Sequence, residues 1–538
     1  METTCQHCQH SFIITEADQA YYKRLGVPKP VRCPACRFQL RLTNRNEHTL
    51  YQRQCAVCGN NTLSVYSPDK KYTVYCRTCW WSDTWNPLDY GQDIDFTRPL
   101  FDQLLELKQR VPRIALMNDA TGENSDYCNH VYRLKNCYMV YDATDCENSL
   151  YSLGIYYVKD SIDCSYNHKC ELCYETTHSE DCYNVNYSWH VNNCRDSYFL
   201  TDCNGCSNCF MSVGLRNKSY CIFNQQYNPE DYAKKLASYQ LDTRAGINRA
   251  RDEFNEFTLT VPYKYYRGLR NEMSSGDYLV GNLATTFSFQ TKTSEHCAYC
   301  FGIFQSKDCY DFTVYGEEAE LLYEAHACGG QAYGNWFCNI VWHGQNNLYC
   351  DQCLNGPENC FGCIGLKNEK YCILNKQYSE TDYNTLKDKL IEHMKQTGEW
   401  GQFFSPALST YAYNETMAQE MFPLTKAQAR ASGWMWQDQL PGTYGKADAT
   451  KQIYDCTHCH KSFKLIPQEL KFYATQNIPW PEICPDCRHI ERMKHRVPYQ
   501  LWHKQCMNTG CKTEFETTYS PDRKELVYCE DCYTKTVV

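Results

Sequence analysis

The chain has 538 residues, a net charge of −9 and 38 cysteines. This length excludes a single small domain and predicts several domains. The N-terminal segment METTCQHCQHSF is polar, which argues against a secretion signal or membrane anchor and favours the reducing cytoplasm. In that compartment, closely spaced cysteines bind metal more often than they form disulfides. The charge is uneven, because residues 5–55 carry +5, residues 451–505 carry +4 and the remainder carries −18.

The first 100 residues contain four cysteine pairs, separated by 24, 18 and 17 residues. The pairs are Cys5 and Cys8, Cys33 and Cys36, Cys55 and Cys58, and Cys76 and Cys79. Two residues between cysteines let one tight turn direct both sulfurs at one ion, and two such knuckles complete a tetrahedral thiolate site. We expect the knuckles to come from different hairpins. Residues 1–100 are therefore predicted to form tandem zinc ribbons with two closed structural sites.

A linker helix is expected at 101–124, and a repeat of twelve residues follows over 125–228. Residues twelve apart form columns of similar side chains. One column consists of cysteines, and a second column, three residues further along, holds small side chains almost throughout. A further column holds Asn or Asp, which tolerate the left-handed backbone of a tight corner. The first column is Cys170, Cys182, Cys194 and Cys206, and the Asx column includes Asn136, Asn148, Asp160, Asn184, Asp196 and Asn208. This pattern predicts a β-solenoid with twelve-residue coils.

A looser second solenoid copy is predicted at 285–378, where insertions interrupt the columns. The two copies end alike, in GLRNKSYCIFNQQY and GLKNEKYCILNKQY. Residues 229–284 and 379–450 are expected to be helical caps and linkers that cover the unpaired coil ends. The fold class is therefore mainly β, a two-part β-solenoid with helical caps and zinc ribbons at both termini. The 22 central cysteines are interpreted as packed thiols, with disulfides and extra metal sites left open as alternatives.

The last 88 residues, 451–538, repeat the spacing of the first block. The predicted ligands there are Cys456, Cys459, Cys484, Cys487, Cys506, Cys511, Cys529 and Cys532. The third pair has four intervening residues instead of two, which makes the fourth site the least regular. With the N-terminal block, this predicts about four Zn²⁺ ions per chain.

A helical segment with regularly spaced arginines follows the second knuckle of each block. The arginines are Arg37, Arg41 and Arg45 in the first block, and Arg488, Arg492 and Arg496 in the second. Spacing of four residues places three guanidinium groups on one helix face, which suits phosphate contacts with a nucleic acid. The alternative is that these arginines pair with the acidic solenoid or simply form the solvated face of a helix.

The segment CQHCQHSFIITEADQAYYKRLGVPKPVRCPACR resembles the "probable zinc-ribbon" family of short bacterial domains. CTHCHKSFKLIPQELKFYATQNIPWPEICPDCR resembles it again, and the whole chain is similar to long bacterial proteins with ribbons beside a Cys/Tyr-rich repeat. The resemblance implies a zinc fold in which Cys5, Cys8, Cys33 and Cys36, and their four C-terminal counterparts, are ligands. It implies no settled activity.

Residue patterns of common enzyme classes are missing from the chain: it has no phosphate-binding P-loop, no HExxH and no G-x-S-x-G. The sequence therefore favours a zinc-binding protein without catalytic activity. RNA or a ribonucleoprotein is the expected partner of the basic ends. A protein-interaction scaffold is the alternative, and an enzyme with a site in a solenoid groove is a third hypothesis.

Overall fold

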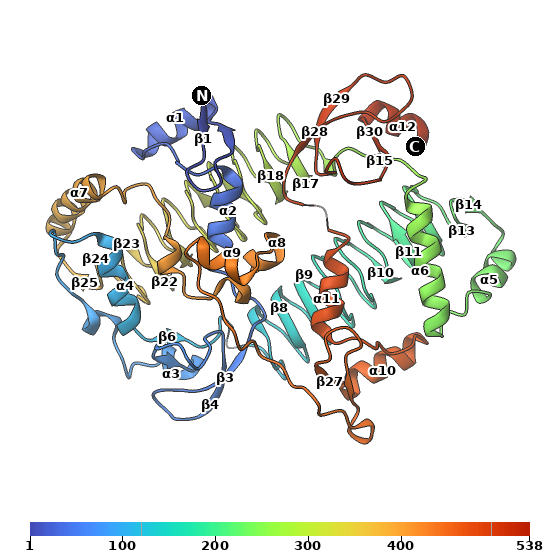
Figure 1. The fold of residues 1–538 in the computed structure, drawn as a ribbon, viewed down its shortest axis with the longest axis horizontal. Helices are drawn as coiled ribbons and strands as arrows, with labels where there is room; N and C mark the ends of the chain where they lie inside the picture. Colours follow the sequence, from blue (N-terminus) through green and yellow to red (C-terminus); the bar gives the residue numbers. More distant parts are fainter. Residues whose placement is uncertain (120, 497, 538) are drawn as a thin grey trace. The chain divides into compact units, whose positions relative to one another are not determined.

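The computed structural model describes residues 1–119, 121–496 and 498–537, and the chain divides into two compact units. Unit 1 consists of Met1–Ala115 and Tyr266–Leu440, and unit 2 consists of Leu116–Tyr265 and Pro441–Val538. Each unit thus joins one terminal cysteine block to a solenoid copy that is distant in sequence. Figure 1 shows both stacks of coils, the first in cyan to green and the second in yellow-green to orange.

Unit 1 contains the N-terminal cysteine block and the second solenoid copy. Its helices are α1 (Glu16–Leu25), α2 (Pro34–Leu42), α3 (Arg77–Trp81), α4 (Leu100–Arg110), α7 (Glu380–Thr397), α8 (Met417–Met421) and α9 (Lys426–Ala431), with 3-10 turns η1 (Pro87–Tyr90), η2 (Pro406–Leu408) and η3 (Tyr413–Glu415). The strands of its cysteine block are β1 (Glu2–Thr4), β2 (Ser11–Ile13), β3 (Tyr51–Gln54), β4 (Asn61–Ser64), β5 (Val74–Tyr75) and β6 (Arg113–Ile114). The solenoid strands are β16 (Gly268–Leu269), β17 (Gly276–Val280), β18 (Ser288–Lys292), β19 (Ser306–Lys307), β20 (Ala319–Glu320), β21 (Asn339–Val341), β22 (Asp351–Cys353), β23 (Glu358–Phe361), β24 (Lys370–Ile373) and β25 (Lys376–Gln377).

Unit 2 contains the first solenoid copy and the C-terminal cysteine block. Its solenoid strands are β7 (Asn129–Tyr132), β8 (Tyr138–Thr144), β9 (Leu150–Tyr156), β10 (Tyr183–Asn186), β11 (Arg195–Thr201), β12 (Phe210–Val213), β13 (Cys221–Ile222) and β14 (Gln225–Gln226). The remaining strands are β15 (Tyr263–Lys264), β26 (Ile453–Asp455), β27 (Ser462–Lys464), β28 (Trp502–Gln505), β29 (Glu514–Thr517) and β30 (Val527–Tyr528). Its helices are α5 (Pro229–Ala237), α6 (Arg244–Thr258), α10 (Pro467–Gln476), α11 (Pro485–Met493) and α12 (Glu530–Val537), with the 3-10 turn η4 (Ala449–Lys451).

The predicted fold class is confirmed, because both central segments form parallel β-solenoids. In the first copy, paired residues are twelve apart, as in Tyr138 with Leu150 and Tyr198 with Phe210. The Asx column lies at corners with positive φ, for example 50° at Asn148 and 52° at Asn184. Side-chain amides connect these corners along the stack, with Asn148 donating to Asp160 over 2.9 Å. The corner assignment made from the sequence therefore holds.

Each twelve-residue coil has four short sides of three residues. In the first copy, positive φ angles recur at almost every third residue, and every third residue in another register points into the buried lumen. All twelve cysteines of this copy share that inward register, so their separations are multiples of three. This narrow lumen is filled mostly by the small side chains Cys, Ser and Val, with the larger Leu134, Ile155 and Leu200 at a few positions.

Lumen thiols and hydroxyls also satisfy backbone groups. The thiol of Cys194 lies 3.4 Å from the carbonyl of Asn192 and 3.7 Å from that of Cys203. In turn, the hydroxyl of Ser197 accepts the N–H of Cys209, one coil later, over 3.0 Å. Buried backbone groups need such partners, so a small side chain that both donates and accepts fits the lumen. All 38 cysteines lie within the described residues and are free, which favours the packed-thiol interpretation.

The second copy departs from the strict period because some coils have thirteen residues. Ser306 pairs with Ala319, and His326 pairs with Asn339, each thirteen residues on. One extra residue per coil shifts the columns seen in the sequence without changing the stacking. Both copies end in an antiparallel hairpin, β13 with β14 and β24 with β25.

Candidate metal centres and arginine clamps

Four groups of four cysteines bring their sulfur atoms together, and they are the four quartets expected from the spacing. Within each quartet the sulfurs all lie within 4.8 Å of one another. The quartets are Cys5, Cys8, Cys33 and Cys36; Cys55, Cys58, Cys76 and Cys79; Cys456, Cys459, Cys484 and Cys487; and Cys506, Cys511, Cys529 and Cys532. The wider spacing of Cys506 and Cys511 is thus compatible with a complete quartet.

The backbone around each quartet has the same design. The first pair lies on the turn of a short hairpin, such as β1–β2, where Gln9 adopts a φ of 61°. The second pair differs from the expected second hairpin, because it opens a helix: Cys33 is the N-cap of α2, and Cys36 lies in the first turn. The N–H of Cys33 donates to the sulfur of Cys5 over 3.3 Å. Equivalent N–H to sulfur bonds of 3.2–3.3 Å link Cys76 to Cys55, Cys484 to Cys456 and Cys529 to Cys506.

The sulfur spacing fits a tetrahedral ion. The distances between sulfurs are 3.7 Å for Cys8 and Cys33, 4.0 Å for Cys58 and Cys76, 3.5 Å for Cys459 and Cys484, and 3.9 Å for Cys511 and Cys529. A tetrahedron with metal–sulfur bonds of about 2.3 Å has edges of about 3.7 Å. Four thiolates fill all positions of such a site, so no position is left for water or substrate.

In each quartet the pKa of at least one thiol is lowered, as at Cys33, Cys55, Cys456 and Cys511, while other thiols of the same quartet have a raised pKa. A hydrogen bond from the Cys36 thiol lowers the pKa of Cys33 to about 5. In the lumen, burial raises the pKa of Cys164 to about 11. Metal ligation requires the thiolate, and hydrogen bonds favour that state at one thiol or more of each quartet.

A pair of arginines anchors α2 on the solenoid of unit 1, at a site that we call clamp 1. Arg37 pairs with Asp311 over 2.8 Å, and Arg41 pairs with the other oxygen of the same carboxylate over 3.2 Å. The guanidinium of Arg37 also lies 5.2 Å from the ring centre of Tyr299. Asp311 and Tyr299 are successive corner residues of one column, and Glu324 follows them on the next coil.

Clamp 2 repeats this arrangement in unit 2. Arg488 and Arg492 of α11 bind the two oxygens of Asp163 over 3.1 and 2.6 Å. The guanidinium of Arg488 lies 4.7 Å from the ring centre of Tyr151. The corner column Tyr151, Asp163 and Glu175 therefore corresponds to Tyr299, Asp311 and Glu324. Two distant parts of the chain thus use the same residue types for the same anchoring contact.

These contacts correct the expectation that the arginine rows face a nucleic acid. The side chains of Arg37, Arg41, Arg45, Arg488 and Arg492 are at most 5% exposed, and Arg496 is half-buried. Helices α2 and α11 end at Leu42 and Met493, so the third arginine of each row lies beyond the helix. Arg45 bonds instead to Glu47. The alternative interpretation, ion pairs with the acidic solenoid, describes the placement of Arg37, Arg41, Arg488 and Arg492.

The clamps differ in their second carboxylate. In unit 2, Arg251 of α6 lies 2.7 Å from Glu175, and although burial raises the pKa of Glu175, this guanidinium holds it below its usual range. In unit 1, Glu324 lies no closer than 3.8 Å to either Arg37 or Arg41. Burial and the neighbouring Asp311 raise the pKa of Glu324 to about 7.

The acidic partners in the clamps were not among the residues predicted from the sequence; they are Asp163, Glu175, Asp311 and Glu324. One signal was present: Tyr151, Asp163 and Glu175 are twelve residues apart, one corner column further along than the Asx column. Extending the twelve-residue register by three would have singled out Asp163 and Glu175 as the two acidic residues in a corner column that otherwise holds Tyr, Met and Phe.

Residues 1–44 match the model of a family described as "Probable treble clef domain". This agrees with the resemblance seen in the sequence, and with a hairpin knuckle followed by a ligand pair at a helix start. The match describes this segment and not the whole chain. The chain has no detectable relative among curated proteins.

A crystal structure titled as a putative acetyltransferase from Desulfovibrio desulfuricans G20 is similar at 12% identity. The likeness covers 49% of this chain and 68% of that chain with a TM-score of 0.11, too low to carry an argument. Among the described residues, no helix combines the length and apolar character needed to cross a membrane.

Proposed function

We propose that this chain is a zinc-stabilised binding scaffold of the cytoplasm, with four structural Zn²⁺ ions and no catalytic site. Zinc is the metal that best suits four thiolates in a closed tetrahedral site. Thirty-eight free cysteines suit a reducing compartment, where thiols persist. The proposal gives the metal an architectural role.

One observation carries the proposal: in each unit, the residue directly after a metal ligand is an anchor on the solenoid. Arg37 follows Cys36, and Arg488 follows Cys487. An ion that fixes the first turn of α2 also fixes the direction of the Arg37 side chain toward Asp311. The metal sites therefore support the attachment of each cysteine block to its solenoid, and the outer faces of both are left to contact a partner.

The experiment compares a ligand variant with a lumen variant in the full chain. Purified under reducing conditions, the wild type is expected to contain about four zinc ions, one for each quartet. Cys33→Ser should lose one ion and expose residues 1–44 to protease, because metal binding supplies most of the folding free energy of so small a domain. Cys194→Ser, the matched control, should keep all its zinc. Wild-type protein without zinc, or equal zinc loss in both variants, would contradict the proposal.

For the partner, RNA or a ribonucleoprotein is the second candidate, and exposed lysines on the cysteine blocks favour it. Lys23, Lys29, Lys464, Lys471 and Lys494 are exposed, unlike the clamp arginines. Phosphate contacts through these lysines would make the affinity fall steeply with salt. Filter binding of labelled RNA to wild type and to Lys464→Glu/Lys471→Glu tests this candidate. Affinity that is absent at low salt leaves a protein partner as the remaining proposal.

A further inference from the structure

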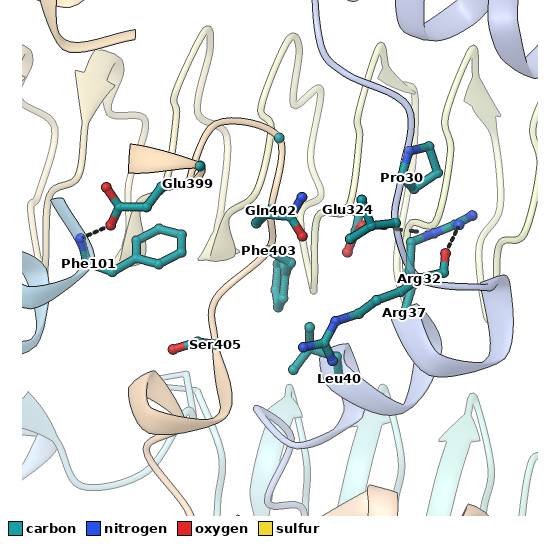
Figure 2. A pocket seen from close by; sticks show the side chains of 13 residues that line it. Pro30, Arg32, Arg37, Leu40, Phe101, Glu324, Glu399, Gln402, Phe403 and Ser405 are labelled. Atoms are coloured by element: carbon teal, nitrogen blue, oxygen red, sulfur yellow. Dashed lines mark hydrogen bonds and ion pairs between the residues drawn. The ribbon is translucent and has the colours of Figure 1, made fainter. Parts of the chain in front are cut away.

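In unit 1, the chain that follows α7 packs on the N-terminal cysteine block, and we call residues 398–440 the cover. Figure 2 shows its first part, where Gln402 of the cover and Leu40 of α2 line the same pocket. Further along the cover, the hydroxyl of Tyr413 accepts a hydrogen bond from Gln39 over 2.8 Å. The cover therefore forms an outer layer over α2.

The cover also binds β3 of the same block, through a buried carboxylate. Glu415 is 3% exposed, and it accepts the hydroxyl of Tyr51 over 2.7 Å and the ammonium of Lys70 over 2.6 Å. Under the cover, Tyr51 and Leu42 at the end of α2 are buried. One short segment thus shields both α2 and β3 from solvent.

The C-terminal block presents the same positions without a cover. Both blocks have 18 residues between the second and third cysteine pairs, so each residue there has a counterpart 451 positions further along. The counterparts of Gln39, Leu42 and Tyr51 are Ile490, Met493 and Trp502. Ile490 is 57% exposed, and the other two are half-buried. Ile490 and Met493 are three residues apart, so they share one face of α11.

Within the described residues, unit 2 has no segment of its own for this surface. Its cap helix α6 is separated from β15 by residues 259–262 alone, whereas the cover of unit 1 has 43 residues. The chain just before β26 contacts the first hairpin of the block instead, where the N–H of Ser462 donates to the carbonyl of Thr443 over 2.7 Å. An exposed apolar helix face at a position that is covered in unit 1 indicates an interaction surface.

The uncovered surface has donors for an acidic partner. The indole N–H of Trp502 is a hydrogen-bond donor in the place of the Tyr51 hydroxyl. Lys504, two residues further on, lies on the same face of β28 and forms no ion pair within the part of the chain that the structure describes. Glu525, which acts on the Lys504 ammonium, is itself paired with Arg523 over 2.9 Å. The charge open to a partner's carboxylate is therefore that of Lys504.

We propose that the face of α11 and β28 around Ile490, Met493 and Trp502 binds a segment of a partner protein that resembles the cover. Residues 409–422 have the required chemistry, with two Glu, no Lys or Arg, and Tyr, Met and Phe side chains around the short helix α8. The acidic side chains suit Lys504, and the Met and Phe side chains bury the apolar face of α11. This partner site rests on the proposed function of the chain as a binding scaffold and specifies what the scaffold binds.

The test measures the fluorescence anisotropy of a labelled peptide with the sequence of residues 407–424, added to full-length, zinc-loaded protein. One peptide is expected to bind per chain, because the chain's own cover occupies the N-terminal block. Ile490→Asp should weaken binding by about tenfold or more, since it removes an apolar contact and buries a charge. Ile13→Asp, the same change at an exposed isoleucine of the N-terminal block, is the control and should leave binding unchanged.

A second pair of changes tests the hydrogen bond expected in the complex. Trp502→Phe keeps an aromatic ring but removes the N–H, and a peptide with Glu415→Gln lacks the carboxylate charge. Each change alone should weaken binding, and the two together should cost less than the sum of their separate effects. Strictly additive effects would overturn the proposed likeness to the cover.

Zinc content, measured on the same samples, separates this site from the proposed function. Protein that holds about four zinc ions but shows no saturable peptide binding would overturn the partner site alone. Ile490→Asp protein that binds as the wild type does would also overturn it. Two other occupants would do the same: a labelled RNA that displaces the peptide and fails to bind the Ile490→Asp protein, or a wild-type dimer that this substitution dissociates in sedimentation.

Discussion

Clamps 1 and 2 attach two cysteine blocks to two solenoids with the same corner column, yet their charges are balanced differently. In clamp 2, Arg251 of α6 lies 2.7 Å from the second carboxylate, whereas in clamp 1 Arg37 and Arg41 lie no closer than 3.8 Å to Glu324. The shared part, two arginines on one aspartate, is the part needed for attachment. The variable part is the second carboxylate, which pairs closely with Arg251 in unit 2 and lies farther from its guanidinium neighbours in unit 1.

The shared aspartates should produce the largest effects when replaced. Asp163→Ala or Asp311→Ala leaves two buried guanidinium groups without their partner, and removing one member of a buried pair costs about 3–5 kcal/mol. Each change should destabilise its own unit by that amount in denaturant unfolding. Asp145→Ala, which removes an exposed pair with Arg133, is the control and should cost less than about 1 kcal/mol. Equal effects of Asp163→Ala and Asp145→Ala would show that the clamp contributes nothing to attachment.

The second carboxylates should give the two units opposite dependences on pH. The pKa of Glu324 is raised from 4.5 to about 7, so the folded state holds its proton more tightly than the unfolded state does. Unit 1 should therefore lose roughly 2–3 kcal/mol of unfolding free energy as pH rises from about 5 to about 7. Glu175 has a lowered pKa, so its contribution is present above its unfolded pKa and is lost as pH falls.

Hydrogen exchange of the α2 and α11 amides between pH 5 and 8, corrected for intrinsic exchange, measures this difference. Glu324→Gln should flatten the response of α2 and leave that of α11 unchanged. A parallel response of both helices in the wild type would show that Arg251 makes no difference.

The lumen should show the smallest effects, and these should depend on side-chain shape. Cys194→Leu adds a branched chain to a filled lumen, at a cost of about 1–3 kcal/mol. Cys194→Ser should cost less, because serine occupies equivalent positions such as Ser197 and can accept the next coil's N–H. Thermal unfolding of unit 2 distinguishes the two. Equal midpoints for both variants would mean that the side chain at 194 has room to spare.

Local spacing predicted much of this molecule. The cysteine quartets and the helix after each second cysteine pair could be predicted from the sequence, because their residues are close together in the chain. The twelve-residue columns likewise predicted the coils of the solenoid. They did not predict that each coil has four sides of three residues. The burial of Arg37 could not be predicted from the sequence. A basic helix face has the same residue pattern whether it contacts RNA or an acidic residue such as Asp311, 274 residues away. The thirteen-residue coils of the second copy hid the Asp311 and Glu324 column further.

The long separation of the clamp partners has a consequence for synthesis. Arg37 leaves the ribosome 274 residues before Asp311 does, an interval of roughly 15–55 s at typical elongation rates. The N-terminal block must keep its fold through that time with its anchoring face uncovered, which a metal-held domain can do and a domain dependent on the solenoid cannot. For unit 2 the order is reversed, because Asp163 is synthesised 329 residues before Arg492. The acidic corner is therefore exposed to solvent until the C-terminal cysteine block has been made. Zinc supply during translation would then govern the yield of unit 1 more than that of unit 2.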